Sequence, residues 1–228
     1  MIISKHESGR SWYVELFSRF IKLWFLKAAG TTLFMALFFY IYFELLHHPR
    51  AVVTKMPATW MDDWVVFWPP AFYVYVSLWL YTALAPALQP NFARLVVYGL
   101  GIGAVCAAGL LIFWIFPTAV PFDTSAPWLQ DSTTSVLRKI DLSGNAFPSL
   151  HVATAIFTGT SLHAIFRETH CPRAVLLLNW VWCALIVYST LAIKQHVLWD
   201  VLSGVLLGAI FGAVYLRIEK RFSVAGDD

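Results

Sequence analysis

The chain has 228 residues, of which 59% are hydrophobic and only 13% are charged, and its mean hydropathy is +0.68. Soluble domains are about 45–50% apolar and about 25% charged, so this composition excludes an ordinary soluble domain and indicates an integral membrane protein. The net charge of +3 is too small to suggest nucleic-acid binding, and the three cysteines indicate neither a disulfide framework nor a metal site.

The first segment, residues 1–22, is basic and aromatic. Trp12, Phe17 and Phe20 are interleaved with Arg10 and Arg19, a pattern typical of an amphipathic helix that lies in the membrane interface. The apolar stretch after it is too long for the core of a cleavable signal peptide. We therefore expect an interfacial helix ahead of the first membrane span.

Six apolar segments follow, each close to the roughly 20 residues that a helix needs to cross a bilayer. Their expected bounds are about Leu23–Leu46, Trp64–Leu88, Ala93–Phe116, Leu150–Phe166, Ala174–Ile193 and Val197–Arg217. In the second segment, Pro69–Pro70 should kink the helix or mark its start near Ala71. The sequence thus predicts an all-α membrane protein, with a six-helix bundle over residues 23–217 and a cytoplasmic tail over residues 218–228.

The orientation follows from the distribution of lysine and arginine. These residues are more frequent on the side that holds both termini and the second and fourth loops, and cytoplasmic loops carry such an excess. We therefore expect a multi-pass protein with both termini in the cytoplasm. The loop before residue 149 and the break at residues 194–196 would then face the periplasm, the exterior or a lumen.

A polar loop, Gly144–Asn145–Ala146–Phe147–Pro148–Ser149, precedes the fourth apolar segment, which opens with Leu150 and His151. Ser149 suits a helix N-cap, and the free N–H groups after such a cap form an anion site. Gly144 and Asn145 would let the loop turn so that its backbone approaches an oxyanion, and His151 would stand beside it to donate a proton. The alternative is a capped helix that carries an interfacial histidine.

A second polar cluster, Lys194–Gln195–His196, lies at the last break between apolar segments, and Asp200 follows it. His196 and Asp200 are four residues apart, so on a helix they share a face. A carboxylate there can hold one ring nitrogen and leave the other as a nucleophile. The alternative is a helix-start carboxylate that only accepts backbone N–H bonds.

Together the clusters favour phosphoryl transfer, since two histidines on one membrane face can divide attack and proton donation between them. Lys194, Arg138 and Lys139 are the cations available to stabilise the phosphate oxygens. For Arg138 and Lys139 the alternative is a solvated loop charge or a lipid head-group contact. No cofactor and no metal are needed in this scheme.

The paired motifs resemble those of the type 2 phosphatidic acid phosphatase superfamily. The family's PSGH motif is matched by Pro148–Ser149–Leu150–His151, with Leu in place of Gly. Its SRxxxxxHxxxD motif is matched at Ser189, His196 and Asp200, with Thr190 in place of Arg, whereas its first motif, KxxxxxxRP, is absent. The forms FPSLH and QHxxxD look more like the branch that contains inositol phosphorylceramide synthase.

This resemblance implies that His196 is the nucleophile, that Asp200 orients it and that His151 is the general acid, while Ser149 and its backbone bind phosphate. The predicted function is a membrane lipid phosphatase that hydrolyses a lipid phosphate or pyrophosphate through a phosphohistidine at the extracytoplasmic face. The alternatives are a phosphotransferase that moves a phospho-head group between lipids, and a catalytically silent lipid-binding protein. A transporter is disfavoured because the polar groups gather at one face. The expected partners are a lipid phosphate and the bilayer, without nucleic acid; the oligomeric state is left open.

Overall fold

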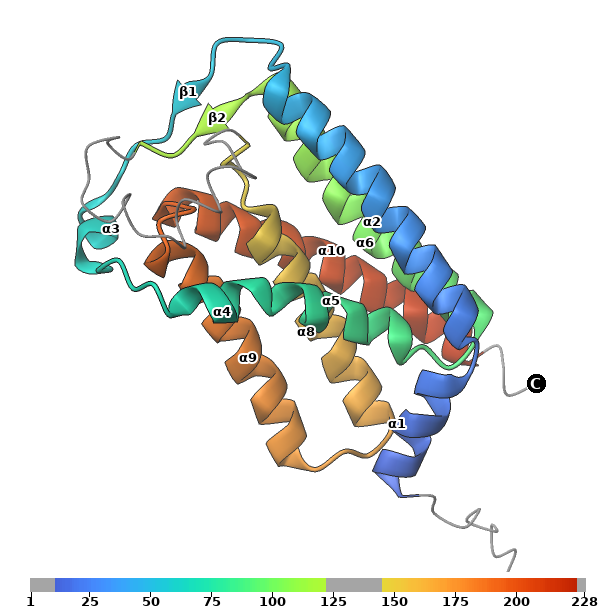
Figure 1. The fold of residues 1–228 in the computed structure, drawn as a ribbon. Coiled ribbons are helices and arrows are strands. Elements are labelled where there is room, and N and C mark those ends of the chain that lie inside the picture. Colours follow the sequence, from blue (N-terminus) through green and yellow to red (C-terminus); the bar gives the residue numbers. More distant parts are fainter. Residues whose placement is uncertain (1–10, 122–144, 225–228) are drawn as a thin grey trace, which may run out of the picture.

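The computed structural model describes residues 11–121 and 145–224, and these residues are mostly helical (Figure 1). Helices α2, α6, α8, α9 and α10, with the shorter α4 and α5, form one bundle. The short strands β1 and β2 lie at one end of it, and helix α1 lies at the other end.

Four helices in the described part of the chain are long and apolar enough to cross a membrane. They are α2 (Trp24–His47), α6 (Phe92–Ile115), α9 (Arg173–Ala192) and α10 (Leu198–Val224). Their starts and ends lie within a few residues of the expected bounds, except that α10 continues past Arg217 into the expected tail. A multi-pass membrane protein is therefore consistent with the structure.

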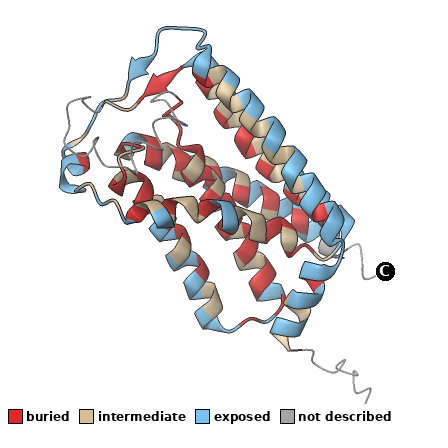
Figure 2. Cartoon of the chain, viewed as in Figure 1, coloured by how far each residue is buried: buried red, intermediate tan, exposed pale blue. Residues whose placement is uncertain are grey.

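The two other expected spans take different forms. The second is shorter than predicted and consists of α4 (Ala71–Val76) and α5 (Leu78–Ala87), which begin after Pro69–Pro70 as expected. The fourth is α8 (Leu150–Glu168), whose threonines and serines make it less apolar than the other long helices. Because neighbouring helices bury α8 on most sides (Figure 2), it needs little lipid-facing apolar surface. The count of six spans stays a prediction.

Helix α1 (Trp12–Ile21) occupies the segment for which an interfacial helix is expected. It is held to the bundle by buried Arg19, whose guanidinium pairs with Glu15 and with Glu168 at the end of α8, each at 2.9 Å. Glu168 also pairs with Arg94 at the start of α6 (2.8 Å). The helix is thus present and docked, while its position at a membrane interface stays a prediction.

The closest helix pair is α8 with α10, and glycines make its approach possible. A Cβ atom at Gly204 would lie 2.5 Å from the Ser149 carbonyl oxygen, and one at Gly208 would lie 2.4 Å from that of Ala153. No side chain fits at such distances, so these positions allow the two backbones to touch.

At the end of the bundle opposite α1, β1 (Thr54–Lys55) pairs in parallel with β2 (Thr118–Ala119). The next helix, α3 (Trp60–Trp64), begins with a capping box in which Thr59 and Asp62 bond each other's backbone. The Asp62 carboxylate is buried and also accepts a hydrogen bond from the backbone N–H of Leu198 (2.8 Å). Asp62 therefore ties α3 to the start of α10. The candidate site lies next to this helix start.

Candidate active site

His151 lies in the first turn of α8, and the local sequence explains why a helix starts there. Ser149 is the N-cap, and its hydroxyl accepts a hydrogen bond from the Val152 N–H (3.3 Å). The Ser149 N–H donates to the Asp200 carbonyl oxygen (3.0 Å). The starts of α8 and α10 are therefore joined directly, which brings the two sequence motifs together.

His196 lies in the tight turn between α9 and α10. The backbone N–H groups of Gln195 and His196 both donate to the Thr190 carbonyl oxygen, at 3.0 and 3.2 Å. Lys194 in this turn adopts the left-handed conformation, with φ of 58°. The turn places His196 just before α10, with 6% of its surface exposed.

Asp200 lies in the first turn of α10 and faces His196, which precedes that helix, and the Asp200 side chain is fully buried. Its Oδ2 atom is 3.5 Å from Nδ1 of His196 and accepts a hydrogen bond from the Val197 N–H (3.0 Å). The same oxygen atom of Asp200 therefore accepts a backbone N–H at the start of α10 and faces the imidazole of His196. This separation exceeds that of a well-formed hydrogen bond.

Two buried atoms of this pair stand without a hydrogen bond. Among the described residues, Nδ1 of His196 and Oδ1 of Asp200 have no hydrogen-bond partner. A buried carboxylate is costly unless it is paired, so Asp200 favours a protonated Nδ1 on the facing ring. Nε2 of His196 is then the nitrogen available for attack.

The centroids of the His151 and His196 rings are 5.8 Å apart, and both side chains line the same cavity. A tetrahedral group between the rings could contact both of them, since hydrogen-bond reach is about 3 Å from each side. The His151 ring is also fixed from α4 and α5. The hydroxyl of Tyr75 is hydrogen-bonded to Nε2 of His151 (2.6 Å), and the Trp79 ring lies edge-on to it at 6.2 Å.

Sequence reasoning did not identify Tyr75 as a neighbour of the candidate site. A buried tyrosine inside an apolar helix needs a hydrogen-bond partner, so the residue type offered a weak signal. The partner, His151, is 76 positions away, and nothing local identifies it.

The residues expected to bind phosphate are only partly gathered around the rings. Ser149 is buried next to His151 with its hydroxyl used as the N-cap, and Asn145 lines the same cavity with its amide bonded to the Tyr42 carbonyl oxygen (3.3 Å). Gly144, Arg138 and Lys139 lie outside the described residues.

Lys194 has a different set of neighbours. Its ammonium donates to the carbonyl oxygens of Asp62 and Val65 in the α3 segment. Burial lowers the pKa of Lys194 from its usual value, and the Asp62 and Asp63 carboxylates oppose this shift. In this arrangement Lys194 fastens α3 to the turn that carries His196. Its role toward phosphate stays a prediction.

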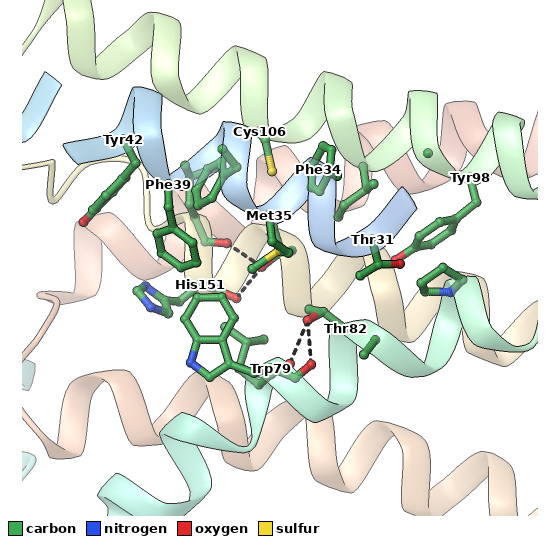
Figure 3. A pocket seen from close by; sticks show the side chains of 18 of the residues that line it. Thr31, Phe34, Met35, Phe39, Tyr42, Trp79, Thr82, Tyr98, Cys106 and His151 are labelled. Atoms are coloured by element: carbon green, nitrogen blue, oxygen red, sulfur yellow. Dashed lines mark hydrogen bonds between the residues drawn. The ribbon is translucent and has the colours of Figure 1, made fainter. Parts of the chain in front are cut away.

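The cavity beside the rings has a volume of about 590 Å³, within the range of about 300–1,000 Å³ typical of small-molecule sites. Most of its lining is apolar and comes from α2, α4, α5, α6 and α8. Figure 3 shows His151 and Trp79 near one end and Thr31 and Tyr98 near the other. No group of three or more His, Cys, Asp or Glu side chains within residues 11–121 and 145–224 is placed to hold a metal ion.

Residues 94–223 match the family model described as PAP2 superfamily, which covers more than half of the chain. The chain belongs to the PAP2 superfamily. No curated protein and no solved structure matches it. The PAP2 match includes α6, α8, α9 and α10, with His151, His196 and Asp200, and leaves α1 to α5 outside it.

PAP2 membership confirms the superfamily to which the motifs pointed, and it is consistent with a phosphatase or phosphotransferase that acts on lipids. The likeness to the inositol phosphorylceramide synthase branch is a finer statement that this match does not address. Thr190, where the family motif has Arg, is fully buried and donates its hydroxyl to the Val187 carbonyl oxygen (2.8 Å). Its backbone supports the turn that holds His196.

Proposed function

We propose that this PAP2 protein hydrolyses a lipid phosphate or pyrophosphate at the extracytoplasmic membrane face, through a phosphohistidine on His196. The observation that carries the proposal is the pair of imidazoles, 5.8 Å apart at the end of an apolar cavity. An apolar cavity accepts a lipid, and two facing imidazoles provide a nucleophile and a proton donor.

In the first step, Nε2 of His196 attacks phosphorus, and the bond between phosphorus and the lipid oxygen breaks. His151 gives a proton to that oxygen, so the lipid leaves as an alcohol or, from a pyrophosphate, as a monophosphate. Asp200 acts through His196, because its carboxylate 3.5 Å from Nδ1 stabilises the positive charge that develops on the ring.

In the second step, water attacks the phosphohistidine. His151, now neutral, accepts a proton from the water, the phosphorus–nitrogen bond breaks, and phosphate leaves. Both histidines then return to their starting protonation states. An alcohol in place of the water would give head-group transfer, the chemistry of the inositol phosphorylceramide synthase-like alternative.

Phosphate binding is assigned to the start of α8, where the first N–H groups of a helix have no intrahelical acceptor. Ser149 fixes this helix start and Asn145 borders it. We include Lys194, Gly144, Arg138 and Lys139 as further candidates from the sequence. The charge distribution supports an orientation with both termini in the cytoplasm.

The test is phosphate release from a panel of lipid phosphates and pyrophosphates by purified protein in detergent. We expect release that vanadate inhibits and that His196→Ala abolishes. Quenching the wild-type reaction with alkaline denaturant, with substrate radiolabelled in its phosphate, should trap label on the protein in an acid-labile, alkali-stable form. The absence of phosphate release and head-group transfer across the panel would reject the enzyme and favour a silent lipid-binding protein.

A further inference from the structure

The cavity at the histidines is long and leads away from them along α2. Its lining residues on this helix extend from Leu26 and Lys27 to Tyr42 and Phe43. Sixteen residues separate Lys27 from Phe43, and a helix rises about 24 Å over that length. One leaflet of a bilayer has a hydrocarbon depth of about 15 Å, half of the roughly 30 Å core. The cavity is therefore longer than one leaflet is deep.

Both ends of the cavity are polar. His151, His196 and Asn145 border the end at the candidate active site. At the far end lies Lys27, which is buried and whose ammonium donates to the backbone carbonyl oxygens of Arg19 and Ala87. Between these ends the lining is mainly aromatic and aliphatic, with Phe34, Met35 and Phe39 among its residues (Figure 3). The shape suits one apolar chain attached to one anionic head.

Two glycines keep the far half of the cavity open. Gly30 on α2 and Gly99 on α6 both line it, and a Cβ atom added to either would meet nothing within 4 Å. Gly30 is the seventh residue of α2 and Gly99 is the eighth residue of α6, and both helices start at the same end of the bundle, so the glycines lie at similar depth. Larger side chains at these positions would fill the cavity without displacing the surrounding helices.

One wall of the cavity does not belong to the family core. The family match begins at residue 94, whereas α2 ends at His47. Helix α2 also has the least buried span, with 6% of its most apolar window buried compared with 28% for each of the other three long helices. Residues of α2 line the cavity, and little of this helix is buried against its neighbours.

We propose that this cavity is a tail-binding site that measures the substrate, and that it selects a lipid phosphate with one hydrocarbon chain longer than a leaflet. The proposal rests on the proposed function, since the head of the lipid lies at His196. Gly30 and Gly99 set the usable length of the site, and Lys27 closes it. Methylene groups up to that limit fill the cavity and gain packing contacts with its walls, whereas a longer chain does not fit.

The first experiment measures kcat/KM for octyl, dodecyl, hexadecyl and eicosyl phosphate at equal detergent dilution. In the wild-type protein kcat/KM should rise through the longest chain. Gly30→Leu or Gly99→Leu should lower the eicosyl-to-octyl ratio at least about fivefold, because the leucine side chain occupies space that only the end of the long chain needs. The ratio for one protein sample is independent of its folded fraction.

Ala29→Leu is the matched control, since Ala29 neighbours Gly30 on α2, is exposed and does not line the cavity. It should keep the wild-type ratio. The proposal is overturned if both glycine variants also keep that ratio, or if Ala29→Leu lowers it equally.

A second experiment does not depend on turnover, so it separates this proposal from the proposed function. An eicosyl phosphonate with a diazirine at its terminal carbon is irradiated with the wild-type protein, and the labelled residues are identified by mass spectrometry. Label should fall on residues 26–31 and 95–99, and a dodecyl probe should label nearer to His151. Label of both probes on Leu33 and Leu37, which are exposed and outside the cavity, would show bulk lipid contact and reject the tail site. Absent phosphate release with deep label would reject only the proposed chemistry.

Discussion

Asp200→Asn tests the chemistry most directly, because the amide is almost the same size as the carboxylate and removes only its charge. Asp200 is fully buried, with Oδ2 3.5 Å from Nδ1 of His196. At an effective dielectric constant of about 20, two unit charges at this distance attract by about 5 kcal/mol. The amide dipole restores part of that attraction, so we expect kcat to fall by about 10³-fold.

The assay is phosphate release under saturating lipid phosphate, together with the melting temperature of each variant in the same detergent. Stability should change little, because the amide oxygen can still accept the Val197 N–H that Oδ2 now accepts. Asp62→Asn is the matched control. Asp62, on α3, is also a buried carboxylate, and it accepts a hydrogen bond from the Leu198 N–H at the start of α10. It should keep kcat within about threefold of wild type, since a surviving hydrogen bond changes the free energy by well under 1 kcal/mol.

A fall in kcat of less than tenfold for Asp200→Asn would refute the assignment of Asp200 as the residue that stabilises the charged ring. So would an equal loss in Asp62→Asn, because that result would attribute the effect to the helix start and not to the imidazole.

Three further substitutions test other parts of the site. Tyr75→Phe removes the hydroxyl from Nε2 of His151 and should lower kcat by about two- to fifteenfold at unchanged KM, the worth of one hydrogen bond; an unchanged kcat would make Tyr75 a packing residue. Gly204→Ala should destabilise the protein by about 1–3 kcal/mol in thermal unfolding, whereas Gly103→Ala, whose Cβ would have its nearest neighbour at 3.8 Å, should not; equal melting temperatures would contradict the close contact. Lys194→Met should raise KM at least about tenfold if the ammonium holds phosphate, and wild-type KM with a lowered melting temperature would leave Lys194 only its role in fastening α3.

Hydropathy was sufficient to locate the four long spans, because a bilayer demands a continuous apolar stretch whatever the helix packs against. It was weaker for α8, where half-buried threonines donate their hydroxyls to the helix's own carbonyl oxygens, as Thr154 does to Leu150 (2.7 Å). It also gave no sign of the break at Ser77, whose hydroxyl donates to the Val74 carbonyl oxygen and accepts from the Trp182 indole. That second contact joins helices far apart in the chain.

The candidate site also combines features that the local sequence predicts with features that it does not. The spacing of His196 and Asp200 predicts a shared face, and the N-cap role of Ser149 follows from its residue type. The partnership of Tyr75 with His151 and of Asp62 with Leu198 depends on tertiary contacts, and no local pattern encodes them. The catalytic roles of the two histidines stay predictions until the variants are measured.

The direct contact between α8 and α10 at Gly204 has an evolutionary consequence. The spacing of the two imidazoles depends on the contact between Gly204 of α10 and the backbone of Ser149, which leaves no room for a Cβ atom. Helix α2 does not form part of this contact. Mutations on α2 can therefore alter which lipids enter without disturbing the reaction centre. A lineage that keeps its α8–α10 junction while its first long helix drifts could acquire new substrates at little risk to its chemistry.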